Sequence, residues 1–171
     1  LDLKNITLFV HDWGGAIGSG TAIRLKERFK RLVIFDTAAF VSNDIPFRIS
    51  LCRLPLIGKF IVRCFNAFAG PATFMTTKTP LSSKVKAAFL APYNNWNNRI
   101  ATHEFVRDIP LEESHRSRKT LQDVDDGLKT LADLPMAICW GKYDFCFHTG
   151  FMKIWQERFP KAEVHEFDAG H

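Results

Sequence analysis

The chain has few of the features that mark secreted, membrane-spanning or nucleic-acid-binding proteins. Only four of its 171 residues are cysteine, and they show no C-x-x-C or other paired spacing. We therefore expect reduced thiols, no metal site and a cytoplasmic location. No stretch reaches the roughly 20 uncharged apolar residues that a membrane-spanning helix needs. Lysine and arginine form no polybasic block, so we expect no nucleic-acid partner.

Internal repeats and low-complexity segments are also absent, and the hydrophobic content of 46% suits a globular chain with one core. The chain opens at Leu1, without Met, almost inside a strand, and closes at His171 directly after Ala169-Gly170. We expect a fragment of a longer α/β protein whose N-terminal strands are missing.

The most informative stretch runs from Ile6 to Gly15. The β-branched and aromatic residues 6–10 predict a short buried strand. From Gly14 onward the residues are mostly small, while larger apolar residues recur at helical spacing. A helix that starts with such small side chains can lie close to the preceding strand. The pattern predicts a nucleophile elbow, a strained strand-to-helix turn that exposes its central residue.

The central residue of this elbow is Asp12, where serine is usual. A carboxylate needs no base to become a nucleophile, and it can displace a leaving group from a saturated carbon to form an ester. Hydrolysis of that ester would need a histidine to activate water and a second carboxylate to orient the histidine.

The rest of the chain divides into three expected parts. Residues 1–43 form the first part of an α/β core, with a second strand over 32–35. Residues 44–119, broken by prolines and rich in phenylalanine, form a helical cap. Residues 120–171 complete the core, with strands over 136–140 and 163–167 and a capping box of Thr120 and Asp123 at the start of a helix. The strands are expected to form a mostly parallel sheet flanked by helices.

The apolar surplus of the cap has three interpretations. The side chains could pack between cap and core, line a tunnel for an acyl chain, or contact a membrane surface beside the basic residues Arg48, Arg53, Lys59 and Arg63.

Three candidate catalytic residues occur at predicted strand ends, in the order nucleophile, acid, base. They are Asp12, Asp144 and His171. This order is that of α/β-hydrolases. Asp36, which ends the second strand, is an alternative acid, and Asp168 is expected to serve the backbone turn instead.

Trp13 is the candidate for stabilising a leaving group or oxyanion. Its backbone N–H directly follows the nucleophile, and its indole N–H is a second donor. The alternative is an aromatic ring packed at the cavity floor. A further donor would come from a part of the fold that precedes this sequence.

The sequence resembles the haloalkane dehalogenase and epoxide hydrolase branch of the α/β-hydrolases. Within that branch it is similar to the β-lactone decarboxylases of bacterial long-chain olefin biosynthesis. The resemblance covers nearly the whole chain and is carried by residues 11–15, 66–73, 90–93, 98–101, 105–111, 139–141, 144–147 and 169–171.

This resemblance implies that Asp12 is the nucleophile, His171 the base, Asp144 its partner and Trp13 a leaving-group donor. It implies no cofactor, a small hydrophobic substrate, namely a long-chain β-lactone or a haloalkane, and an assembly with other olefin-biosynthesis enzymes. Epoxide hydrolases of the branch use two cap tyrosines, whereas this cap contains only Tyr93. That difference argues against epoxide opening.

A second class of function stays open: a non-catalytic hydrolase-fold binding protein, or an inactive truncated product. Without earlier strands the sheet would keep an uncovered edge. The 171-residue chain by itself is then expected to be poorly stable or inactive.

Overall fold

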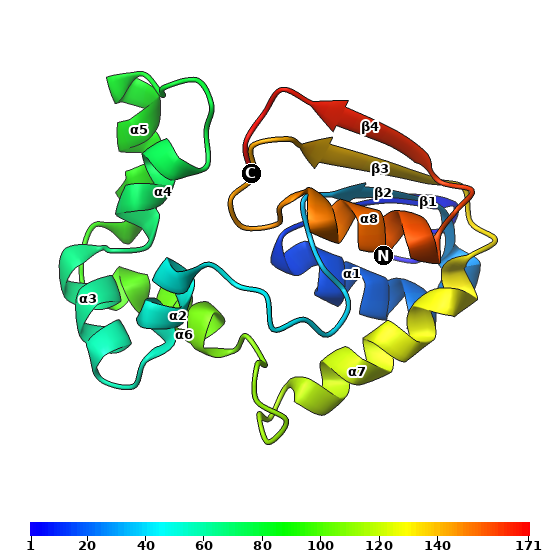
Figure 1. Ribbon diagram of the computed structural model, residues 1–171, viewed down its shortest axis with the longest axis horizontal. Helices are drawn as coiled ribbons and strands as arrows, with labels where there is room; N and C mark the ends of the chain where they lie inside the picture. The colour runs from blue at the N-terminus through cyan, green and yellow to red at the C-terminus, as the bar shows by residue number, and fades with distance from the viewer.

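The computed structural model describes residues 1–171 and contains one parallel sheet of four strands. The strands lie side by side in chain order, β1 (Ile6–His11), β2 (Phe29–Phe35), β3 (Met136–Gly141) and β4 (Glu163–Phe167). All four therefore end at the same edge of the sheet, toward the cap on the left of Figure 1. This confirms the predicted parallel α/β architecture, in which functional residues gather where the strands end.

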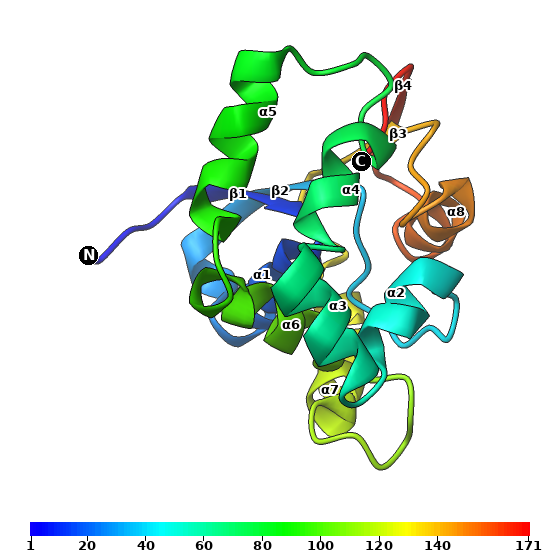
Figure 2. The ribbon, with the colours of Figure 1, turned by 90° about the vertical axis from the view of Figure 1, so that its left-hand side faces the viewer.

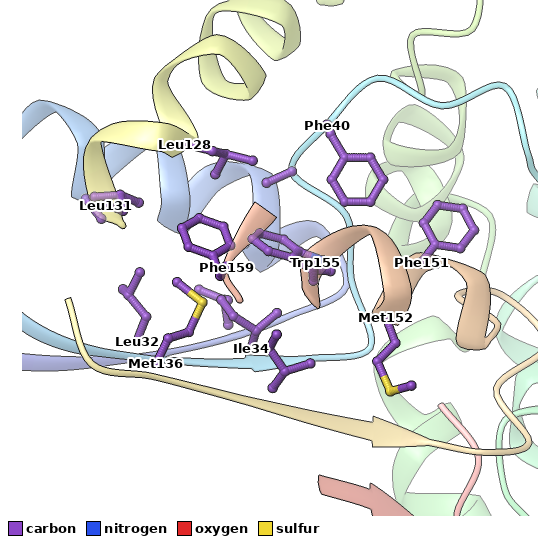
Figure 3. Packing of buried hydrophobic residues seen from close by; sticks show 14 of the residues in the cluster. Leu32, Ile34, Phe40, Leu128, Leu131, Met136, Phe151, Met152, Trp155 and Phe159 are labelled. Atoms are coloured by element: carbon purple, nitrogen blue, oxygen red, sulfur yellow. The ribbon is translucent and has the colours of Figure 1, made fainter. Parts of the chain in front are cut away.

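Helices cover one face of the sheet. These are α1 (Trp13–Arg24), α7 (Arg118–Gly127) and α8 (Thr149–Arg158), and all lie on the same side in Figure 1. Short 3₁₀ turns follow α1 at Lys26–Arg28 and α7 at Leu128–Leu131. Between the sheet and these helices lies the main core, in which Leu32 and Ile34 point toward Trp155 and Phe159 (Figure 3). Trp155 is fully buried, and its indole N–H donates to the carbonyl of Thr37 at 2.8 Å.

The other face of the sheet carries exposed apolar side chains. Phe9 is 63% exposed and Phe167 is 50% exposed, and Phe9 stacks only on Phe35 of the neighbouring strand. Side chains on a strand alternate between the two faces, so these residues point away from the helices that bury Val10 and Ile34. In this chain, one of the two faces of the sheet therefore remains uncovered.

The cap is inserted between β2 and α7. It consists of α2 (Phe47–Arg53), α3 (Ile57–Phe65), α4 (Ala69–Met75), α5 (Ser83–Leu90) and α6 (Ile100–Arg107), with 3₁₀ turns at Ala91–Tyr93 and Asn97–Arg99. Figure 2 looks onto this part, with α3, α4 and α5 toward the viewer. A small separate core of Ile49, Cys52, Val62 and Val106 holds α2, α3 and α6 together.

The start of α7 differs from the prediction. The helix begins at Arg118, so Thr120 and Asp123 lie inside it and form no capping box. The N-cap residue is Ser117, whose hydroxyl donates to the side chain of Asp108 at 2.8 Å instead of capping the helix. A contact with a distant residue thus overrides the local signal. The expected boundary between residues 119 and 120 falls within this helix.

Candidate active site

Asp12 occupies a strained turn between β1 and α1. Its backbone has φ 48° and ψ −125°, a conformation that non-glycine residues rarely adopt. Its N–H donates to the carbonyl of Asp36 at 3.2 Å, and its carbonyl accepts from the N–H of Gly15 and the hydroxyl of Thr37. These bonds, from the end of β2 and the first turn of α1, hold the carboxylate above the strand ends. The side chain remains 45% exposed.

The glycines of the elbow allow its close packing. A Cβ on Gly15 would lie 1.9 Å from Oγ1 of Thr37, and one on Gly18 would lie 2.5 Å from Cγ1 of Val10. Both distances are far inside van der Waals contact, so the helix can approach the sheet only because these residues have no side chain. The small-residue pattern after Asp12 therefore serves the predicted purpose.

Asp144 and His171 are hydrogen-bonded to each other. Nδ1 of His171 lies 2.7 Å from Oδ2 of Asp144, whose side chain is fully buried. The other oxygen of Asp144 accepts from the backbone N–H groups of Cys146 at 2.6 Å and Phe147 at 2.9 Å. Burial raises the pKa of Asp144, but the bond to His171 and the backbone donors outweigh burial and hold the pKa below its usual value. The carboxylate is therefore ionised at neutral pH.

His171 faces Asp12 with its other nitrogen. Nε2 lies 3.9 Å from Oδ2 of Asp12, which is within ion-pair range but longer than a hydrogen bond. Burial lowers the pKa of His171, but the nearby carboxylates of Asp12 and Asp144, the latter hydrogen-bonded to the ring, outweigh burial and raise the pKa to about 10. The two acidic side chains therefore favour the protonated form of His171.

Asp36 does not contact His171 through a hydrogen bond. Its Oδ1 accepts from the N–H of Gly141 at 2.8 Å, and the residue is 7% exposed. Burial, together with the neighbouring Asp144, outweighs the effect of the Gly141 bond and raises the pKa of Asp36 to about 6. The geometry thus gives the alternative acid a different position, between the nucleophile elbow and the loop that carries Asp144.

Trp13 lines the site with its indole edge against the ring of Phe105, at a centroid distance of 5.4 Å. The indole N–H groups of Trp140 and Trp155 are bonded to backbone carbonyls, whereas that of Trp13 makes no bond within the protein. The ring thus packs against the cap while its N–H stays available, and a role in stabilising a leaving group stays a prediction.

Two aromatic neighbours of His171 escaped the sequence-based prediction. The His11 ring lies 4.4 Å from that of His171, and the Phe147 ring stacks on it at 5.7 Å. Burial and the positive charge of His171 lower the pKa of His11. His11 directly precedes Asp12, but its contact with a residue at the far end of the chain has no sequence signature. Asp168 lies outside the site and pairs with Lys78 of the cap.

The site opens into a large apolar cavity between cap and core. The cavity has a volume of about 1500 Å³, and 28 of its 45 lining residues are hydrophobic. Asp12, Trp13 and His171 contribute polar groups, and the cap contributes most of the apolar wall, including Ile49 and Phe68. The volume exceeds the roughly 300–1,000 Å³ of common ligand pockets and suits a long apolar molecule.

No group of three or more histidine, cysteine or acidic side chains is arranged to hold a metal ion. The four cysteines are free. A membrane-spanning helix would need a length and apolarity that no helix of this structure has.

Comparison with known proteins relates the chain to two enzyme groups. It is 46% identical to a cis-3-alkyl-4-alkyloxetan-2-one decarboxylase of Shewanella oneidensis, over 98% of this chain and 54% of the relative. It is 40% identical to a protein of the same name from Xanthomonas campestris, over 95% of this chain and 55% of the relative. The chain thus spans about half the length of the curated relatives it matches. No protein-family model matches it.

The structure is similar to that of the haloalkane dehalogenase DatA from Agrobacterium tumefaciens C58, with a TM-score of 0.83 and 22% sequence identity. The match covers 99% of this chain and 60% of the dehalogenase. At this identity the likeness establishes the fold, and the decarboxylase relatives share much more of the sequence. The chain therefore has the α/β-hydrolase fold, and it is similar to the oxetanone decarboxylases in sequence and to the haloalkane dehalogenases in structure.

Proposed function

We propose that the protein is a β-lactone decarboxylase that converts a cis-3-alkyl-4-alkyloxetan-2-one into a cis-alkene and carbon dioxide. The observation that carries this proposal is the 46% identity to a relative of that name, which extends across both core segments and the cap. The apolar cavity above Asp12 supports it, because a lactone with two alkyl chains needs a long apolar site around a small polar centre.

In the proposed reaction, Asp12 attacks the saturated ring carbon that is bonded to the ring oxygen, not the carbonyl carbon. The C–O bond breaks, the ring oxygen leaves as part of a carboxylate, and Asp12 becomes an ester. Loss of carbon dioxide then supplies the electron pair of the new double bond, while the ester C–O bond breaks and regenerates Asp12. Attack on the carbonyl would instead give an acyl-enzyme, and its hydrolysis would yield a hydroxy acid.

The charged groups of the site have complementary roles in this scheme. Trp13 donates its free indole N–H to the carboxylate that ring opening releases. His171, held by Asp144, balances the negative charge of Asp12 before attack. Esterification removes that charge, so the pKa of His171 falls. The loss of carbon dioxide needs no base, and a neutral imidazole would serve only the competing hydrolysis of the ester. Asp36 is not required as the histidine partner.

The second candidate is a haloalkane dehalogenase, favoured by the fold similarity to DatA. Here Asp12 would displace a halide, Trp13 would bind the leaving ion, and water activated by His171 would hydrolyse the ester. The chemistry up to the ester is shared, so the substrate and the fate of the ester distinguish the two.

The test uses the full-length protein with a cis-dialkyl β-lactone and, separately, a bromoalkane. We expect alkene and carbon dioxide from the lactone and no bromide release. Bromide release with intact lactone would refute the decarboxylase, and hydroxy acid without alkene as the product would refute the loss of carbon dioxide from the lactone. Asp12→Ala should lower turnover by at least roughly 10³-fold, whereas the exposed Asp168→Asn serves as the control. If the correctly folded protein turns over neither substrate, the non-catalytic alternative prevails.

The proposal also includes a cytoplasmic location and an assembly with other enzymes. Four free cysteines suit a cytoplasmic protein. The assembly with other olefin-biosynthesis enzymes remains a prediction, which co-purification from the native cell would test.

A further inference from the structure

We propose that the outer face of the cap docks onto a lipid bilayer that contains anionic headgroups. This inference goes beyond the reaction and does not depend on which electrophile Asp12 attacks. It rests on the distribution of charge along the chain, on the exposed apolar residues of α2 and α3, and on a strained turn that joins these two helices.

Residues 45–103 contain no aspartate and no glutamate. The same stretch holds eight of the 23 basic residues, Arg48, Arg53, Lys59, Arg63, Lys78, Lys84, Lys86 and Arg99, while all 18 acidic residues lie elsewhere. The cap is therefore strongly cationic, although the rest of the chain carries more acidic than basic residues. Such a one-sided distribution attracts a negatively charged partner over a distance of about the Debye length.

Half of these cations are exposed and free of acidic partners. Arg53 pairs with Glu112, and Lys78 pairs with Asp168. Arg63 and Arg99 bond to backbone carbonyls within the cap. The remaining four form no salt bridge and are exposed, namely Arg48, Lys59, Lys84 and Lys86. Their charge is available to an external anion.

Two of these cations, Arg48 and Lys59, lie on α2 and α3, where exposed apolar side chains accompany them, whereas Lys84 and Lys86 lie on α5. Six of these apolar side chains form what we call the cap apolar patch, with exposed fractions from 42% to 81%: Phe47, Leu54, Leu56, Ile57, Phe60 and Phe65. In Figure 1, α3, which carries Ile57, Phe60 and Phe65, lies at the left end of the molecule, away from the sheet. Lys59 lies within α3, between Ile57 and Phe60 in sequence. Exposed apolar residues gathered in this way mark an interaction surface.

The turn between α2 and α3 exposes Leu56, whose backbone is strained. Leu56 has φ 62° and ψ −56°, and the N–H of Ile57 donates to the carbonyl of Pro55 at 2.7 Å. This is a γ-turn with positive φ, a rare conformation for a branched side chain. Leu56 is nevertheless 81% exposed, so contacts of its side chain within the molecule do not offset the strain. Insertion into an apolar phase would give that contact.

A bilayer suits this surface better than a folded protein partner does. The α2–α3 hairpin combines exposed apolar side chains with the exposed cation Lys59, which is the composition of segments that lie in the membrane interface. Each Lys or Arg near an anionic leaflet strengthens binding roughly fivefold. Helix α2 also connects the patch to the cavity, because Phe47 and Leu54 lie at the patch while Ile49 and Leu51 line the cavity. An apolar substrate could then pass from the bilayer without crossing water.

The test is co-sedimentation of the full-length protein with vesicles of phosphatidylcholine alone or mixed with phosphatidylglycerol. We expect binding to the mixed vesicles, at least tenfold weaker binding to phosphatidylcholine, and loss of binding at high salt. The double variant Leu56→Ser/Phe60→Ser should weaken binding at least tenfold, and Lys59→Glu roughly fivefold or more. Lys161→Glu, which changes an exposed lysine of the core, is the matched control and should bind normally.

Circular dichroism and thermal melting must first show that each variant folds, and Lys59→Arg should restore the binding that Lys59→Glu loses. Three results would overturn the proposal: no binding of the unchanged protein to mixed vesicles, equal losses for Lys161→Glu and Lys59→Glu, or a patch-dependent dimer in sedimentation velocity without vesicle binding. None of these measurements requires turnover, so a failed activity assay leaves this test intact.

Discussion

The imidazole of His171 and the carboxylate of Asp144 are joined by a hydrogen bond of 2.7 Å between Nδ1 and Oδ2. The two residues are 27 positions apart and meet because β3 and β4 are parallel neighbours that end at the same edge of the sheet. The bond fixes the orientation in which Nε2 of His171 faces Asp12.

Asp144→Asn should reduce turnover strongly while preserving the fold. An uncharged amide cannot stabilise an imidazolium, and it can reverse the ring tautomer, so we expect a loss of roughly 10²–10⁴-fold in kcat. Asp36→Asn is the matched control, because Asp36 makes no hydrogen bond to His171, and we expect less than a tenfold change. Steady-state kinetics of both variants decides the assignment of the acid, and equal losses would contradict it.

The protein should become less stable as the pH rises through the range in which His171 loses its proton. The folded pKa of His171 is about 10, against 6.5 for an unperturbed histidine. The stabilisation from its ion pairs is therefore complete below about pH 6.5 and declines as the pH approaches 10. Urea unfolding between pH 7 and pH 10 should show this decline, by roughly 1 kcal/mol or more, and His171→Gln should remove it.

Asp36→Asn should stabilise the protein at alkaline pH. The folded pKa of Asp36 is raised from 3.8 to about 6, so the folded state binds its proton more tightly than the unfolded state does. The resulting cost is absent below about pH 4 and complete above pH 6, where Asn should add roughly 1–3 kcal/mol to the free energy of unfolding.

Asp36→Ala provides the control for this prediction. Alanine also removes the charge, but it leaves the N–H of Gly141 without its acceptor, which should destabilise the protein by about 1–3 kcal/mol relative to Asn. Chemical denaturation of both variants at pH 8 checks the order. An Asn variant that is less stable than the unchanged protein at pH 8 would contradict the elevated pKa.

Adjacent glycines in the elbow should respond differently to substitution. Gly15→Ala would place its Cβ 1.9 Å from Oγ1 of Thr37, so we expect a loss of several kcal/mol in stability and a displaced Asp12. A Cβ on Gly14 meets nothing within 4 Å, and Gly14→Ala should be neutral or slightly stabilising within a helix. Thermal melting of the two variants tests the close approach, and equal effects would argue against it.

The 171-residue chain alone should be less stable than the full-length protein. Phe9 and Phe167 lie exposed on the uncovered face of the sheet, and β1 is an edge strand with free backbone groups. We expect a broad melting transition and aggregation when only these residues are expressed. Calorimetry on both lengths provides the comparison, and a sharp reversible melt of the short chain with full activity would be the contrary result.

Local patterns in the sequence were sufficient to predict the four strands and the elbow. The run from Ile6 to Val10 is too apolar and β-branched for a surface turn, and the glycines after Asp12 predicted a helix packed close to its strand. These features depend on neighbouring residues, so they can be read from the sequence. The capping box of Thr120 and Asp123 failed because a contact between Ser117 and Asp108 determines where α7 begins.

By itself the sequence determined the fold class, the elbow with its carboxylate, and a set of residues at strand ends that could act together. Only the tertiary structure decided which acid bonds to His171, because Asp36 and Asp144 both follow strands. The loop after β3 brings Asp144 to the histidine, whereas Asp36 bonds to Gly141. It also placed His11 and Phe147 against the imidazole and left the cap apolar patch exposed. Such pairings depend on how separate strands and helices pack in space, and sequence periodicity records only which face of an element each residue occupies.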